Sequence, residues 1–74
     1  MEELLKLLSE IRPDVDFSSK NLAEDGILES MDIMIILDTL ATHYNITFNP
    51  LDIVPENFDS VEAIYELLQK TIAG

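Results

Sequence analysis

Apolar residues recur at helical spacing in three segments of the chain, and this periodicity constrains the fold more than any other feature. The first segment, Glu2 to Ile11, places four apolar side chains on one helical face, at i, i+3, i+4 and i+7: Leu4, Leu7, Leu8 and Ile11. Glu2 and Glu3 lie in its first turn, where the helix dipole favours negative charge. Pro13 ends this helix, because the residue before a proline avoids helical backbone angles.

The other two segments predict a second and a last helix. The second helix starts at or just after Ser30 and continues to about His43. Its inward face contains five apolar side chains: Ile33, Ile36, Leu37, Leu40 and Tyr44. The last helix is predicted to start at Asp59, because Glu62 follows three residues later and completes an Asp variant of the capping box. Its apolar side chains also repeat at helical spacing: Val61, Ile64, Tyr65, Leu68 and Ile72.

The remaining segments are connections. The polar stretch from Asp14 to Glu29 contains four apolar residues that we expect to anchor it to the core: Phe17, Leu22, Ile27 and Leu28. Gly26 marks a turn that requires a positive φ. Pro50 and Pro55 can each open a short helical turn. Because no segment alternates like a strand, we predict an all-α four-helix bundle of three longer helices and one short third helix, as a single domain over residues 1–74.

Net charge and composition argue against several classes of function for this chain. Fifteen acidic residues against four basic ones give a net charge of −11, which argues against nucleic-acid binding and against attraction to an anionic membrane. The charge favours partners with basic patches. With no cysteine, the chain forms no disulfide and has no thiolate nucleophile or cysteine zinc ligand. The longest apolar run, Ile33 to Leu37, is too short to insert in a bilayer, and the amino-terminal residues lack the positive region of a signal peptide. We therefore expect a cytoplasmic monomer.

Few residues suggest catalysis or metal binding. The one histidine, His43, is interpreted as a helix-end imidazole that the dipole favours. Asp14, Asp16 and Ser18 alternate like the first ligands of a calcium-binding EF-hand loop, and Asp25 falls at its twelfth position. However, Ser19 stands where such a loop needs glycine, and the twelfth ligand is usually a glutamate. No metal site is predicted, and calcium binding at this loop stays as a minor hypothesis.

Ser30 is the most informative residue, because it stands at the start of the second helix. One interpretation is an ordinary N-cap serine. The other is a site for a covalently attached phosphate, which the free amides and the helix dipole would favour. Met31, Met34 and Ile35 follow within about one turn and lie largely off the inward face. They either fill the core or form a surface on which partner proteins dock, a role that suits methionine.

These residues resemble the acyl carrier and peptidyl carrier protein family. The resemblance rests on Asp25-Gly-Ile-Leu-Glu-Ser-Met-Asp-Ile33, which is similar to the carrier signature of a glycine turn followed by Asp-Ser-Leu at the head of the second helix. The segment from Ile53 to Ile64 is similar to the third and fourth helices of stand-alone carriers. The resemblance covers nearly the whole chain and is strongest to D-alanyl-carrier-like proteins, which serve adenylating ligases.

The resemblance implies that the chain is a substrate shuttle and not an enzyme. Ser30 would carry 4′-phosphopantetheine, attached from coenzyme A by a phosphopantetheinyl transferase, and the thiol of this arm would hold an acyl or aminoacyl group as a thioester. The implied partners are that transferase, an acyl- or aminoacyl-adenylating ligase and a downstream acyltransferase or synthase. The implied docking residues surround the serine: Glu29, Met31, Asp32, Met34 and Ile35.

Three positions depart from the family pattern. Glu29 replaces the usual aspartate before the serine, and Met31 replaces the usual leucine, a change that conserves volume. Ile35 stands where fatty-acid carriers have glutamate, which argues for a dedicated partner with a more apolar docking site. Glu29 also leaves open an alternative function, an unmodified carrier-like helical module that works by docking alone.

Overall fold

The computed structural model describes all 74 residues and contains helices but no strands, which confirms the all-α prediction. The elements are α1 (Glu2–Ile11), α2 (Ser30–Tyr44), the 3-10 turns η1 (Pro50–Asp52) and η2 (Pro55–Phe58), and α3 (Val61–Ala73). The bounds of α1 agree with the prediction, and α2 ends one residue later, where Asn45 adopts a left-handed conformation.

The short third helix is present only as two 3-10 turns, and proline explains why. Pro50 and Pro55 each occupy the first position of a turn. Proline cannot continue a preceding helix, and it forces the residue before it into extended backbone, as seen at Val54 with φ −128° and ψ 151°. One continuous helix through both turns is therefore excluded.

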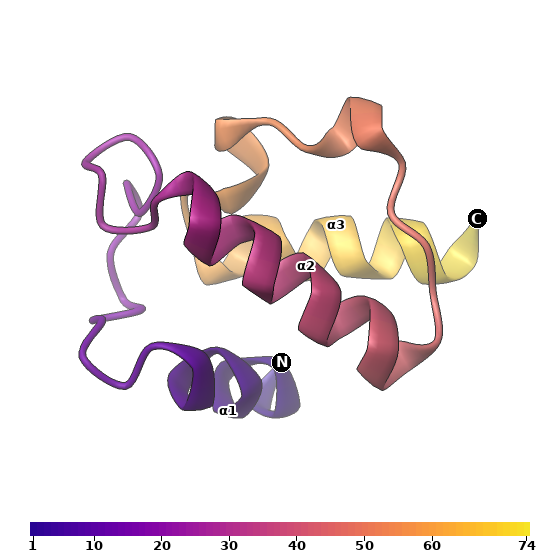
Figure 1. The fold of residues 1–74 in the computed structure, drawn as a ribbon, viewed down its shortest axis with the longest axis horizontal. Helices are drawn as coiled ribbons and strands as arrows, with labels where there is room; N and C mark the ends of the chain where they lie inside the picture. Colours follow the sequence, from indigo (N-terminus) through magenta and orange to yellow (C-terminus); the bar gives the residue numbers. More distant parts are fainter.

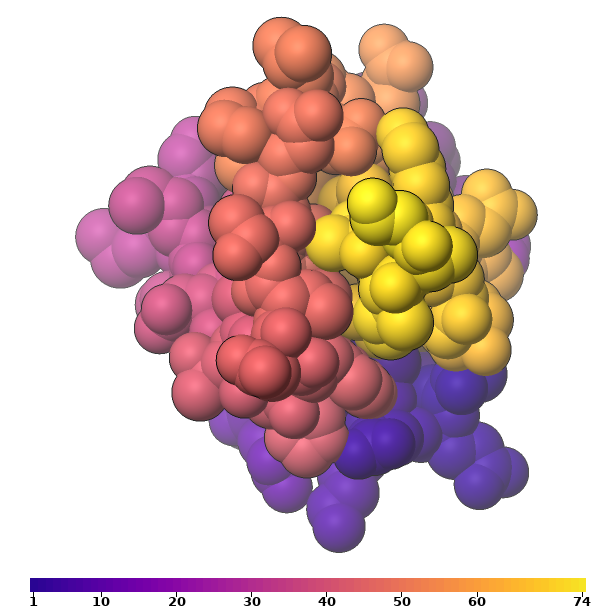
Figure 2. Space-filling view, turned by 90° about the vertical axis from the view of Figure 1, so that its right-hand side faces the viewer, coloured from indigo at the N-terminus to yellow at the C-terminus, as the bar shows by residue number.

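The long connection between α1 and α2 covers one end of the helical assembly. In Figure 1 the chain leaves α1 on the left, loops through residues 12–29 and enters α2 on the same side, where α3 also begins. The segment from Asn45 to Val54 returns along the opposite part of the molecule. Figure 2 shows this segment lying beside the last turns of α3. The start of α2 and the end of α3 are thus at opposite ends.

Twelve apolar side chains form the core, and no polar residue is buried with them. They come from all three helices, from η2 and from the long connection: Leu4, Leu8, Phe17, Leu22, Leu28, Ile36, Leu40, Phe58, Val61, Ile64, Leu67 and Leu68. Three of the four predicted anchors of the connection are therefore buried, and Ile27 is half-buried. On α3 the prediction missed Leu67 and wrongly included Ile72, which is exposed near the end of the helix. No helix combines the length and the hydropathy needed to cross a membrane.

The predicted start of the last helix was wrong by one residue. Ser60, not Asp59, is the N-cap of α3, and its hydroxyl accepts a hydrogen bond from Ala63 N at 3.1 Å. The Asp59 carboxylate instead accepts bonds from the amides of Ala23 and Glu24 in the long connection, at 3.2 and 2.9 Å. These longer-range bonds compete with a local cap, and the adjacent serine then caps the helix.

Candidate functional site

The site is built where the long connection turns into α2. Gly26, with φ +73°, reverses the chain, a conformation that glycine adopts without a steric penalty. Leu28 is buried and its amide donates to Leu22 O at 2.8 Å, which fixes the exit from this turn. Glu29 is then extended, with φ −90° and ψ 170°, and is the N-cap of α2. Ser30 is therefore the first helical residue, and its interpretation as an N-cap serine was wrong.

Ser30 presents its hydroxyl group to solvent. The residue is exposed, and its Oγ forms no hydrogen bond within the protein. The backbone N–H groups of Ser30 and Met31 also have no acceptor in the chain, as is usual in the first turn of a helix. These amides and the positive end of the α2 dipole would favour an anionic group attached to Oγ.

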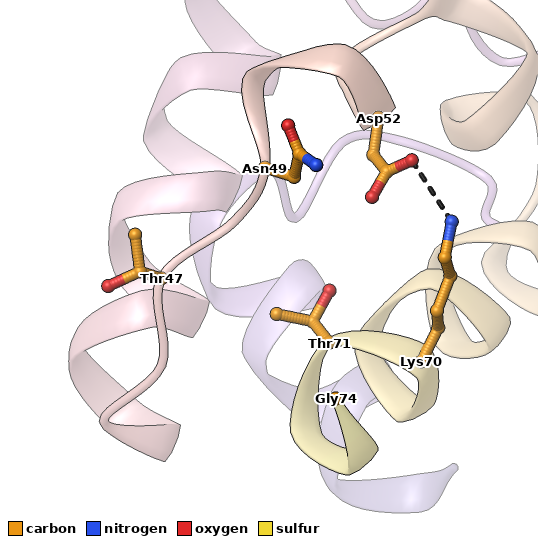
Figure 3. Close-up of a pocket in the computed structure, with 6 residues that line it drawn as sticks. All are labelled: Thr47, Asn49, Asp52, Lys70, Thr71 and Gly74. Carbon is orange, nitrogen blue, oxygen red and sulfur yellow. Dashed lines mark hydrogen bonds and ion pairs between the residues drawn. The ribbon is translucent and has the colours of Figure 1, made fainter.

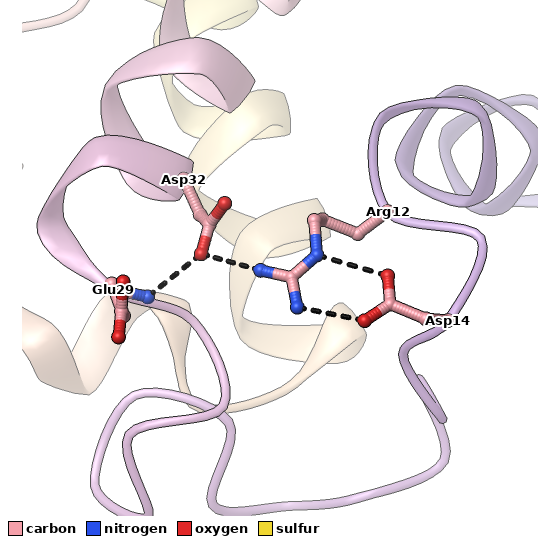
Figure 4. Close-up of polar contacts among 4 residues, drawn as sticks. All are labelled: Arg12, Asp14, Glu29 and Asp32. Carbon is pink, nitrogen blue, oxygen red and sulfur yellow. Dashed lines mark hydrogen bonds and ion pairs between the residues drawn. The ribbon is translucent and has the colours of Figure 1, made fainter.

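A network of charged side chains lies beside the first turn of α2 and links it to Arg12 and Asp14 (Figure 4). Arg12 binds the Asp14 carboxylate through Nε at 3.0 Å and Nη2 at 2.9 Å, while its Nη1 binds Asp32 Oδ2 at 2.6 Å. The same Asp32 oxygen accepts a bond from Glu29 N at 3.0 Å. The bonds to Asp14 and then to Asp32 raise the pKa of Arg12, and the bond from Arg12 lowers the pKa of Asp14. Both groups therefore stay charged at neutral pH.

Beside Ser30, α2 exposes an apolar surface. Met31, Met34 and Ile35 are 72%, 69% and 44% exposed, and together with Asp38 they line a shallow hollow. We call these three side chains the α2 apolar patch. The alternative that they fill the core is wrong, because Ile36 and Leu40 on the other side of the helix take that place. An exposed apolar group of this kind is typical of an interaction surface.

The structure brings together most of the residues predicted for the site. Ser30, Glu29 and the α2 apolar patch all lie on the exposed surface at the start of α2. Asp32 differs, because its side chain is only 13% exposed and is bound to Arg12. Sequence reasoning missed Arg12 entirely. The spacing of Glu29 and Asp32, which places two acids at N-cap and N3, was the signal that could have indicated a capping role for Asp32.

Other candidate residues do not gather into a chemical site. His43 Nε2 lies 2.6 Å from Glu3 Oε1 on the surface. Asp14 is bound by Arg12, and Asp16 Oδ1 accepts bonds from the hydroxyl and amide of Ser18, at 2.6 and 3.0 Å. No three acidic or histidine side chains are placed to hold one metal ion.

A separate polar hollow lies at the far end of α3. Figure 3 shows its lining residues: Thr47, Asn49, Asp52, Lys70, Thr71 and Gly74. Lys70 Nζ lies 3.1 Å from Asp52 Oδ1, so its charge is compensated within the chain. Because this hollow lies at the opposite end of the molecule from Ser30 and none of its lining residues is hydrophobic, it is not part of the site.

Comparison with known proteins adds no assignment. No protein-family model, no curated protein and no solved structure matches the chain.

Proposed function

We propose that the chain is an acyl or aminoacyl carrier protein that bears 4′-phosphopantetheine on Ser30. The observation that carries the proposal is the exposed Ser30 hydroxyl, which is free of internal hydrogen bonds and adjoins the α2 apolar patch. The all-α fold also supports the proposal, although two 3-10 turns stand between α2 and α3 where the resemblance implies a short third helix. The resemblance supplies the identity of the group, and the geometry supports its attachment point.

The residues at the start of α2 fit such a group. Ser30 Oγ can approach an attacking position without breaking an existing hydrogen bond. In the attachment reaction it would form a bond to the β-phosphorus of coenzyme A while the bond from that phosphorus to the bridging oxygen breaks. Adenosine 3′,5′-bisphosphate leaves, and the hydroxyl proton passes to a base of the transferase. The free amides of Ser30 and Met31 and the α2 dipole then stabilise the phosphodiester anion.

The chain's own contribution is to present the group and not to catalyse a reaction. When attached, the arm would supply a thiol that holds an acyl or aminoacyl group as a thioester. The α2 apolar patch would contact a phosphopantetheinyl transferase, an adenylating ligase and a downstream acyltransferase or synthase in turn. Methionine side chains adapt to differently shaped partners, which suits successive docking on one surface. Glu29, exposed beside Ser30, would add a negative charge for basic residues of these partners.

The test is an intact-mass measurement after incubation with coenzyme A and a broad-specificity phosphopantetheinyl transferase. We expect a gain of one phosphopantetheine in the wild-type chain and in Ser9→Ala, a control at another exposed serine. We expect no gain in Ser30→Ala. A gain that persists in Ser30→Ala would show that the attachment point is wrong.

The alternative, a helical module that works by docking alone, is favoured by Glu29 in place of the family's aspartate. It predicts no mass gain in the wild type while a known carrier in the same tube is modified. Glu29→Asp then separates the two explanations. Modification of this variant would identify the longer side chain as a barrier to one transferase, whereas continued absence would support the docking module.

A further inference from the structure

We infer that Arg12 is a positioning residue for the modification of Ser30, acting through Asp32 on the first turn of α2. This inference rests on the proposed function and adds a residue that neither periodicity nor the signature around Ser30 indicates. It begins with the orientation of the guanidinium group. Arg12 is the C-cap of α1, and its amide donates to Leu8 O at 2.9 Å, so its backbone is fixed at the end of that helix.

Asp14 fixes the plane of the Arg12 side chain. Nε and Nη2 both bind this carboxylate, and a two-point contact to a planar guanidinium leaves it little rotational freedom. The remaining nitrogen, Nη1, is thereby directed at Asp32, twenty residues further along the chain. The side chains of Arg12 and Asp32 are 28% and 13% exposed, so water screens their contact less than it would between fully exposed side chains.

Asp32 in turn holds the backbone of Glu29, the residue before Ser30, through a hydrogen bond. A single oxygen, Oδ2, accepts both Arg12 Nη1 and Glu29 N, at 2.6 and 3.0 Å. The position of the carboxylate thus determines where the Glu29 N–H lies, and Ser30 follows directly. Without Arg12, Asp32 would be free to rotate toward solvent, and the N-cap would lose the bond that holds it.

The network is separate from the docking surface. Asp32 is only 13% exposed, whereas Met31 and Met34 are 72% and 69% exposed. Loss of Arg12 should therefore disturb the geometry of Ser30 without removing partner contacts. This difference predicts a lower kcat for transfer at an unchanged KM for the carrier, whereas loss of a docking side chain raises KM.

The experiment measures phosphopantetheine transfer from coenzyme A to wild type, Arg12→Gln, Asp32→Asn and the double variant. We expect kcat to fall about tenfold in each single variant, since small displacements of a reacting group have effects of this size or larger. The double variant should be no slower than either single variant, because both substitutions weaken the same charged contact between Arg12 and Asp32. Lys70→Gln is the control for charge: it also removes one positive charge, from the single ion pair of Lys70 with Asp52 at the far end of α3, and should react like wild type.

A second readout does not depend on the transferase. The exchange of the Glu29 amide hydrogen with solvent, followed by NMR, should be faster in Arg12→Gln than in wild type or Lys70→Gln. Circular dichroism shows whether each variant is folded. If Arg12→Gln does not fold, both measurements are made on the isosteric variant Asp32→Asn instead. An unchanged Glu29 exchange rate, or a raised KM at normal kcat, would overturn the inference even if wild type is modified. Wild type that is not modified at all would instead overturn the proposed function.

Discussion

Replacing Leu22 by alanine should destabilise the protein strongly, although Leu22 lies in a loop. Its side chain is 0% exposed and belongs to the same core as the three helices. Its backbone is fixed on both sides: the amide donates to Asp59 O at 2.8 Å, and the carbonyl accepts from Leu28 N at 2.8 Å. Because these bonds hold the main chain in place, the surrounding residues cannot easily move in to fill the space that the smaller side chain leaves.

The expected cost follows from this rigidity. Buried leucine-to-alanine changes cost about 2–5 kcal/mol, and more where the cavity cannot collapse, so we expect about 3–4 kcal/mol for Leu22→Ala. A chain of this length has a total stability on the order of 4–11 kcal/mol. At about 4–8 °C per kcal/mol, Tm should fall by about 12–32 °C.

Urea denaturation followed by circular dichroism measures this cost. Leu51→Ala is the matched control, because Leu51 is 83% exposed and its substitution should change the free energy of unfolding by no more than about 0.5 kcal/mol. Both variants should keep the wild-type dependence on urea concentration. A cost below about 1 kcal/mol for Leu22→Ala would refute the reasoning, since it would mean that the connection is not an integral part of the core.

Three further predictions concern charge and docking. Hydrogen bonds from the Ser18 hydroxyl and amide lower the pKa of Asp16 below its ordinary 3.8, so the unfolded state binds a proton at this carboxylate more readily than the folded state does. Asp16→Ala should therefore lose a constant amount of stability relative to wild type above about pH 5, and this loss should disappear as the pH falls through the lowered pKa. Urea denaturation at several pH values measures the difference. The net charge of −11 should make Tm rise as salt increases from very low to moderate concentration, and a fall over that range would contradict this. Met34→Ala should leave Tm nearly unchanged but raise the KM of phosphopantetheine transfer, because Met34 is exposed in the α2 apolar patch; an unchanged KM would exclude it from docking.

The spacing of apolar residues in the sequence was sufficient to predict most of the fold. In α1 the apolar spacing and Pro13 together specify both the buried face and the end of the helix. In α2 the spacing separated the buried Ile36 and Leu40 from the exposed methionines. These inferences succeed because a helix turns by a fixed angle per residue, so the sequence alone determines which side chains share a face.

Local pattern failed where a residue had a distant partner. Asp59 and Ser60 are both good N-caps, and the choice between them depends on amides of Ala23 and Glu24, some 35 residues away. Arg12 was missed for the same reason, because its contact with Asp32 spans 20 residues. The choice between Leu67 and Ile72 also depended on tertiary packing, since both fit an apolar stripe on α3 but only Leu67 is covered.

The same long-range contacts explain how the long connection can place Ser30, the first residue of α2, in a fixed position. Two independent attachments hold the turn at Gly26 from its two sides. Before the turn, the connection binds Asp59, which lies between η2 and α3. After the turn, Arg12 at the end of α1 holds the first turn of α2 through Asp32. Residues just beyond α1 and just before α3 therefore hold the segment that leads into Ser30, the first residue of α2. The proposed docking on the α2 apolar patch would leave these attachments intact, because the patch and the charged network share no side chain.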